Sequence, residues 1–342
     1  MTITLENADW RLLYFCVAVY YTDATVKSSK VREGFEFMSW TAFLLIAASI
    51  AMHSLWHFLC KSSGKSSWAF FALFSTSLFL TMLPFALCSG ILFKLDEQTL
   101  RFALISSVVA GLGDLGLMLA YKYSDISLAY PMARALPVFL TMAGCVIFDW
   151  GKSLGTLAIT GMLIIFAGCM LMAFSNNSSG KTLREKLAFV KKGLPGILLA
   201  AFATTAYTVS DSFGVKSIME HFPDCNKLLA AGTYSCVRES LVTVALWGGA
   251  GWLAFRKKDE GNLKALVKTY HPYAAGIFAA LAYVLILISM NYVSNVSFVQ
   301  SFRQLSLPLS ALLGYFILKE KISKLRWLAL LLIMAGLLMS IF

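Results

Sequence analysis

The chain has 342 residues, of which 58% are hydrophobic and only 14% charged. This balance excludes an ordinary soluble domain, because a soluble fold of this size could not bury so much apolar surface. The net charge of +11 comes from Lys and Arg dispersed over short loops, so it indicates contact with a membrane surface and no nucleic-acid partner.

The predicted elements begin after an N-terminal extension, residues 1–37, whose apolar stretch 12–21 is too short to span a bilayer and lacks the basic start of a signal peptide. Beyond it, apolar runs recur that can each cross a hydrocarbon core of about 30 Å as a helix. Ten spans are predicted, at residues 40–60, 68–93, 102–121, 128–148, 154–174, 196–216, 228–255, 273–292, 296–318 and 325–342.

Residues 123–174 and 292–342 are degenerate copies of one another, in which Arg134 aligns with Arg303. Five spans per copy turn the second copy upside down in the membrane. The predicted fold class is therefore an all-α integral membrane protein whose ten transmembrane helices form two inverted five-helix repeats, an arrangement typical of secondary transporters. The predicted domains are a first repeat at 38–175, a basic linker loop at 176–195 and a second repeat at 196–342.

Most Lys and Arg of the loops follow the odd-numbered spans. The positive-inside rule places these loops in the cytoplasm and both termini outside. We expect a multi-pass protein of the cell (inner or plasma) membrane, surrounded by lipids, as a monomer or homodimer. Seven Cys without paired spacing indicate neither a disulfide framework nor a zinc site, and no cofactor is expected.

Ionisable residues inside the predicted spans are the main functional signal. Each opposes insertion by roughly 2.5–3.5 kcal/mol unless it pairs or lines a wet cavity. Three are acidic and three basic, so structural ion pairs are an open alternative to a substrate site, above all for the adjacent Arg238 and Glu239. The six residues are Asp114, Arg134, Asp211, Arg238, Glu239 and Arg303.

The two equivalent arginines, Arg134 and Arg303, are expected to approach the midplane from opposite faces and to bracket one central point. A guanidinium group binds carboxylate or phosphate oxygens in a forked geometry. The natural ligand is an anionic or zwitterionic substrate, or an internal carboxylate, for which Asp211 and Asp114 are the candidates. A buried carboxylate can also carry a coupled proton.

Prolines lie close to both arginines. Pro137 and Pro308 each remove an amide donor, and they predict either a local break of the helix where polar groups meet the substrate or a simple packing kink.

His53 and His57 lie four residues apart beside Trp56. They predict a polar, proton-accepting lining or plain packing, and no metal site, because no third ligand has suitable spacing. The predicted substrate-binding residues are thus Arg134, Arg303, Tyr130, His53, Trp56, Tyr207 and Gln304. The predicted proton-coupling or charge-balancing residues are Asp211, Asp114, Glu239 and His57.

The segment from Tyr121 to Arg134, followed by Pro137, resembles the fourth-helix signature of EamA-type transporters of the drug/metabolite transporter superfamily. Its counterpart, which runs from Arg303 to Gly314, resembles the signature as well. This resemblance implies a ten-helix inverted-repeat fold, a central cavity lined by both halves, and export or uptake of amino acids, metabolites or related solutes. It also implies cytoplasmic termini, opposite to the charge pattern.

Two shorter segments resemble one branch of that superfamily. His53-Ser-Leu-Trp56-His57 is similar to its first helix, with His57 where Asn is usual, and the segment from Tyr207 to Gly214 is similar to its sixth. Gln304 stands where this branch often has Glu, which weakens a proton-coupling role at that position.

The function predicted is alternating-access transport of a small polar metabolite that is anionic or zwitterionic, such as an amino acid or an organic acid. One alternative is a lipid or amphiphile flippase on the same fold. Another is an intramembrane aspartyl protease, suggested only by the three-residue match in Gly111-Leu-Gly-Asp114. HExxH, GxSxG and Walker motifs are absent from the sequence, so an enzyme is not expected.

Overall fold

The computed structural model describes residues 39–62, 67–123, 126–175, 183–256, 263–317 and 322–341. All of them belong to one compact unit, while the extension predicted over 1–37 lies outside the described residues. Across the described ranges the regular structure is helical, without a β-strand. The all-helical part of the predicted fold class is confirmed.

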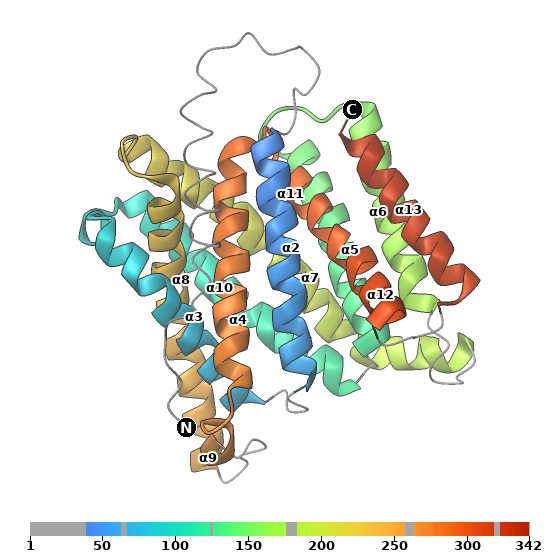
Figure 1. Cartoon of the computed structure of the whole chain (residues 1–342), viewed down its shortest axis with the longest axis horizontal. Helices are drawn as coiled ribbons and strands as arrows, with labels where there is room; N and C mark the ends of the chain where they lie inside the picture. The colour runs from blue at the N-terminus through green and yellow to red at the C-terminus, as the bar shows by residue number, and fades with distance from the viewer. Residues whose placement is uncertain are drawn as a thin grey trace. The chain divides into compact units, whose positions relative to one another are not determined.

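The helices run between two faces of a bundle (Figure 1). In chain order they are α2 (Trp40–Ser62), α3 (Trp68–Cys88), η3 (Leu92–Lys94), α4 (Glu97–Tyr123), α5 (Ile126–Ile147), α6 (Thr156–Phe174), α7 (Leu183–His221), α8 (Lys227–Phe255), α9 (Leu263–Leu266), α10 (His271–Ser289), η4 (Met290–Tyr292), α11 (Val296–Phe302), η5 (Arg303–Leu305), α12 (Ser306–Ile317) and α13 (Lys324–Ser340). We call the face at which α2 begins and α3 ends the first face, and the opposite one the second face.

Each predicted span overlaps one or more of these helices, and among the described residues five helices are long and apolar enough to cross a membrane. One boundary differs clearly. The loop predicted over 176–195 is helical from Leu183 onward, because its residues are good helix formers. Their polarity hid the helix from a prediction based on apolar runs.

The two prolines next to the paired arginines have different effects. Of the two alternatives left open, a local break is found only near Pro308, where the chain is divided into α11, η5 and α12, whereas α5 continues through Pro131 and Pro137. At the break, Ser306 Oγ donates to the Arg303 carbonyl (2.9 Å) and Gln304 Nε2 to the Gln300 carbonyl (3.1 Å). Side chains thus satisfy backbone oxygens where the regular helix is interrupted.

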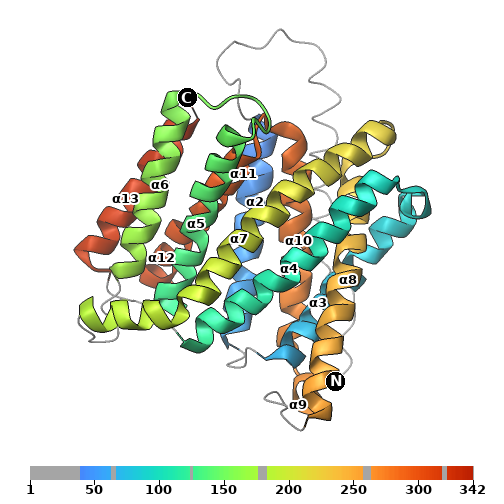
Figure 2. The same cartoon turned by 180° about the vertical axis from the view of Figure 1, so that it is seen from behind.

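Helix pairs meet at glycines. A Cβ on Gly161 of α6 would lie 2.6 Å from the Gly336 carbonyl oxygen of α13, and one on Gly116 of α4 would lie 2.5 Å from the backbone nitrogen of Ala200 on α7. Figure 2 shows both pairs, α6 with α13 and α4 with α7, side by side. Such close backbone approach at small residues is typical of helix packing in membranes.

The interior and the surface have the polarity of a bundle in lipid. Buried positions include the charged side chains of Arg238, Glu239 and Asp211. Large apolar side chains point outward in the middle of long helices, such as Val244 (71% exposed) and Leu331 (63% exposed). A soluble protein rarely exposes so many large apolar groups together. The chain is therefore a multi-pass membrane protein.

Candidate functional site

A cavity of about 180 Å³ lies between α2, α3, α4, α5, α7, α8, α10 and η5. Its lining residues lie at the middle of these helices or nearer the second face, such as Trp56 on α2, Phe71 on α3 and Leu117 on α4. Residues from both ends of the chain sequence therefore line one space, which extends from the middle of the bundle toward the second face.

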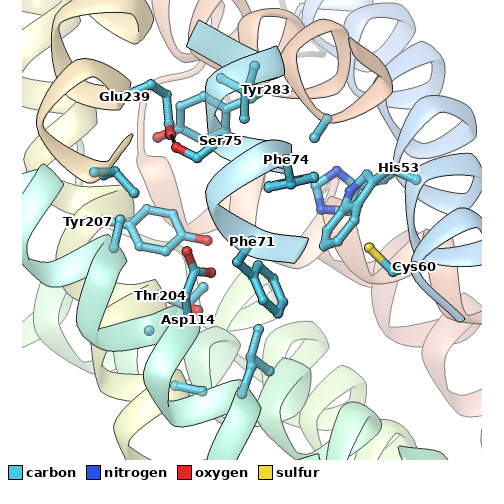
Figure 3. Close-up of a pocket in the computed structure, with 18 of the residues that line it drawn as sticks. His53, Cys60, Phe71, Phe74, Ser75, Asp114, Thr204, Tyr207, Glu239 and Tyr283 are labelled. Atoms are coloured by element: carbon cyan, nitrogen blue, oxygen red, sulfur yellow. Dashed lines mark hydrogen bonds between the residues drawn. The ribbon is translucent and has the colours of Figure 1, made fainter. Parts of the chain in front are cut away.

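Aromatic rings form much of the cavity wall. Trp56 of α2 packs on Phe74 of α3, with 5.4 Å between the ring centroids, and Phe71 lies next to Phe74 at 6.1 Å. Figure 3 shows Phe71 and Phe74 between His53 and Cys60 on one side and Asp114, Thr204 and Tyr207 on the other. The wall can hold an apolar surface of a ligand between polar groups.

A buried charge network centred on Arg238 lies along the α8 side of the cavity. Arg238 Nη1 donates to Glu239 Oε1, and its Nε donates to Ser106 Oγ at 2.8 Å. The guanidinium carbon lies 4.6 Å from the centroid of the Tyr283 ring and 5.2 Å from that of Tyr207. The structural pairing left open for Arg238 and Glu239 is therefore present, and it fixes the guanidinium group.

Asp211 of α7 belongs to the same network and is fully buried. Its Oδ1 accepts a hydrogen bond from Tyr234 (3.0 Å) and lies 3.9 Å from Arg238 Nε, while its Oδ2 accepts one from Tyr283. Asp211 was expected to partner Arg134 or Arg303. That expectation is wrong, because the faces of α7, α8 and α10 bring it to Arg238 and two tyrosines.

The two equivalent arginines line the same cavity, and both are buried. Arg134 Nη2 donates to Ser306 Oγ at 3.0 Å, which joins α5 to α12. Arg303 Nη1 has a long contact of 3.4 Å with Gln300 Oε1, and its Nε has no acceptor within the described part of the chain. Neither forms an ion pair with Asp114 or Asp211 among the described residues.

Asp114 of α4 lines the cavity from the first half of the chain. Within the described ranges its carboxyl group accepts no hydrogen bond and has no cation within 4.0 Å. The cavity thus presents one carboxyl group and one guanidinium group, those of Asp114 and Arg303, that no ion pair among the described residues balances.

The structure brings most of the predicted site residues together. His53, Trp56, Asp114, Arg134, Tyr207, Glu239 and Arg303 line the cavity. Gln304 is buried beside Arg303, and Asp211 lies in the network behind the wall. The side chains of Tyr130 and His57 lie outside the described residues.

Sequence reasoning missed several lining residues, among them Phe71, Phe74, Thr204 and Tyr283. The two phenylalanines lie in apolar spans and carry no signal that separates them from lipid-facing rings. Tyr283 did carry one, because it lies in mid-span, away from the interfacial positions that tyrosine favours in membrane helices. No three His, Cys, Asp or Glu side chains of the described ranges gather to hold a metal ion.

A compact layer closes the bundle between the cavity and the first face; we call Phe102, Trp150, Phe213 and Asn295 the closing layer. Phe213 stacks on Phe102 (5.6 Å between centroids) and meets Trp150 edge-on (6.1 Å). Asn295 Nδ2 donates to the carbonyls of Trp150 and Lys152, both at 3.0 Å. Phe102 on α4 and Phe213 on α7 lie nearer the first face than the cavity residues of the same helices, and Trp150 and Asn295 lie just outside α5 and α11 at that face.

Comparisons with known proteins agree on one class. Residues 73–342 match the family described as Sugar transport protein. The chain is 26% identical over 266 residues to an uncharacterized transporter of Archaeoglobus fulgidus, which covers 77% of this chain and 84% of that protein. A solved crystal structure is similar with a TM-score of 0.61 and 15% identity, over 87% of this chain and 96% of that chain; this likeness concerns the fold alone.

Proposed function

Because the chain belongs to the sugar transport protein family, and is thus a transporter rather than an enzyme, we propose that it carries a small polar metabolite across the membrane by alternating access. The substrate bears an anionic or zwitterionic group, as amino acids and organic acids do. The observation that carries this proposal is the placement of Arg134 and Arg303, one from each half of the chain, on the wall of one cavity.

The proposed architecture has ten spans in two inverted repeats, 38–175 and 196–342, as in the EamA-type transporters that the chain resembles. Helix packing supports it. If each helix of the first half is exchanged with its counterpart in the second, the pair α4 and α7 becomes α10 and α2, and both pairs are in contact. The pairs α3 with α8 and α6 with α13 map onto themselves, and both of these are also in contact.

The closing layer supports alternating access. The cavity extends toward the second face, while Asn295 and the stacked rings of Phe102, Trp150 and Phe213 occupy the route to the first face. In the proposed cycle, rearrangement at η5 and in the closing layer opens the first face while the second face closes. A 3₁₀ segment between two α-helices is a common hinge.

We assign the acidic residues different roles. Asp211 and Glu239 have a structural role as partners of Arg238, because hydrogen bonds from that guanidinium, two tyrosines and Ser75 hold them in place. Asp114 faces the cavity and is the candidate for proton coupling. The proposal places the protein in the cell membrane, with the basic second-face loops in the cytoplasm, as a monomer or a homodimer.

The test is transport by the purified protein in proteoliposomes, with Arg134→Gln and Arg303→Gln beside Arg101→Gln. Arg101 is exposed and pairs with Glu97 on its own helix, so it controls for loss of one positive charge. We expect uptake to fall at least tenfold in the two cavity variants and to stay near wild type in Arg101→Gln. Unchanged uptake by both folded cavity variants would refute the arginine site.

A further inference from the structure

Two polar groups on the cavity wall that form no ion pair among the described residues restrict what the cavity can hold. Arg238 and Glu239 neutralise one another, but Asp114 and Arg303 have no such partner among the described residues. An uncompensated charge in a membrane interior is costly. A ligand that supplies an anion to Arg303 and hydrogen-bond donors to Asp114 satisfies both groups at once, whereas a neutral apolar ligand satisfies neither.

The surroundings of Arg303 favour an anion with two oxygens. Gln300 and Gln304, three residues before and one after it, are fully buried, and Gln300 Nε2 and Gln304 Oε1 have no partner in the described part of the chain. The Arg303 Nε is likewise without an acceptor. A carboxylate at the guanidinium fork can accept from Arg303 Nε and from Gln300 Nε2, whereas Gln304 Oε1 can accept from a hydroxyl group of the ligand.

Another part of the cavity wall suits hydroxyl groups and a carbohydrate ring. Asp114 offers two acceptor oxygens, and the Thr204 hydroxyl lies beside it (Figure 3). The rings of Trp56, Phe71 and Phe74 provide a flat apolar surface on which the C–H face of a sugar ring can pack. A cavity of about 180 Å³ is large enough for a small solute.

We infer that the substrate is an acidic sugar, a monosaccharide that carries a carboxylate. Its carboxylate binds Arg303, its hydroxyl groups donate to Asp114, and its ring packs on the aromatic wall. This inference rests on the proposed transport function and narrows its substrate class. Asp114 and Arg303 then determine specificity, because Asp114 binds the hydroxyl groups of the ligand and Arg303 binds its carboxylate.

The test compares four probes by thermal shift and calorimetric binding to the full chain in detergent: glucuronate, glucose, cyclohexanecarboxylate and alanine. Glucuronate has both the acid and the hydroxyl groups, while each of the next two lacks one of these features, and alanine is a zwitterion. We expect glucuronate to raise the melting temperature most, because a ligand stabilises the state that it binds. Glucose or alanine binding as tightly as glucuronate would overturn the inference.

Two variants separate the two ends of the ligand. Arg303→Gln should weaken glucuronate binding roughly tenfold to a hundredfold, as expected for loss of charge-assisted hydrogen bonds. Asp114→Asn should weaken glucuronate binding but leave cyclohexanecarboxylate binding unchanged. Arg101→Gln should alter neither. If wild type and Arg303→Gln bind glucuronate equally, the assignment of the carboxylate to Arg303 is wrong.

Proteoliposome uptake distinguishes failure of this inference from failure of the proposed function. Uptake of glucose or alanine without uptake of glucuronate would reject the acidic sugar and leave the transporter intact. Uptake of none of the probes by folded wild-type protein would count against both. Uptake of glucuronate that is lost in Arg303→Gln and kept in Arg101→Gln supports both.

Discussion

Asp211 has none of its surface exposed, and its carboxyl group lies at the centre of the network around Arg238. Two tyrosine hydroxyls, of Tyr234 on α8 and Tyr283 on α10, donate to its two oxygens. The network therefore ties three helices together through a single carboxylate. Removal of one donor leaves a buried charged acceptor without its partner, which is more costly than the loss of an exposed hydrogen bond.

We expect Tyr283→Phe to lower the free energy of unfolding by about 2 kcal/mol, since it deletes a hydrogen bond to a buried carboxylate and little volume. Reversible unfolding in mixed micelles measures the change. The control is Tyr273→Phe, whose hydroxyl donates to the Val267 carbonyl at an exposed site and should cost far less. An equal decrease in the free energy of unfolding in both variants would contradict a structural role of the Asp211 network.

At the scale of the element, the start of α4 is fixed by Asp96. Its Oδ2 accepts from the Thr99 backbone N–H at 3.0 Å, and Ser217 of α7 donates to the same oxygen at 3.2 Å. Burial raises the pKa of Asp96, but the hydrogen bonds from Thr99 and the nearby His221 hold it below the usual value of 3.8. The capping carboxylate thus stabilises the fold in its ionised form.

Because the folded pKa of Asp96 is lowered, its contribution is complete above pH 3.8 and is lost as the pH falls through the lower folded value. We expect Asp96→Ala to reduce the free energy of unfolding by about 1 kcal/mol at neutral pH. The difference from wild type should shrink as the medium is acidified below pH 3.8. Asp224→Asn, which changes an exposed loop carboxylate, is the control and should leave the acid dependence unaltered.

The α6 and α13 contact depends on the absence of a side chain. We expect Gly161→Ala to destabilise the protein by about 1–3 kcal/mol, because the new Cβ would lie 2.6 Å from the Gly336 carbonyl oxygen and force the helices apart. Gly111→Ala is the matched control, since its Cβ meets nothing within 4 Å. The Gly111→Ala variant should gain up to about 1 kcal/mol of stability from helix propensity. Thermal unfolding should therefore show a lower melting temperature for Gly161→Ala and an equal or higher one for Gly111→Ala.

At the scale of the whole molecule, we expect that a covalent cross-link next to the closing layer prevents the first face from opening. Lys152 and Ser294 lie against each other, with the Lys152 N–H donating to the Ser294 carbonyl at 3.0 Å. A disulfide between Lys152→Cys and Ser294→Cys should hold the first face shut, so that uptake stops while binding remains, and reduction should restore uptake. The single-cysteine variants are the controls. Full uptake by the cross-linked protein would mean that this layer does not open during transport.

The sequence predicted the helical, apolar character of the chain well, because composition and periodicity are local signals, and Arg134 and Arg303 do line one cavity. It did not predict that Asp211 pairs with Arg238, since that depends on which faces of α7, α8 and α10 meet. The closing layer was missed for a similar reason. Trp150 and Asn295 lie 145 residues apart in the chain and meet only in the folded bundle.

The break at η5 has a consequence for the two directions of movement. The counterpart helix α5 is continuous although it contains two prolines, so the two arginines sit on helices of unequal stiffness. In the proposed repeat architecture, the two copies are therefore expected to differ in how easily they bend. Under the proposed cycle, opening toward the first face and opening toward the second deform helices of different stiffness. The two half-cycles therefore need not have equal rates.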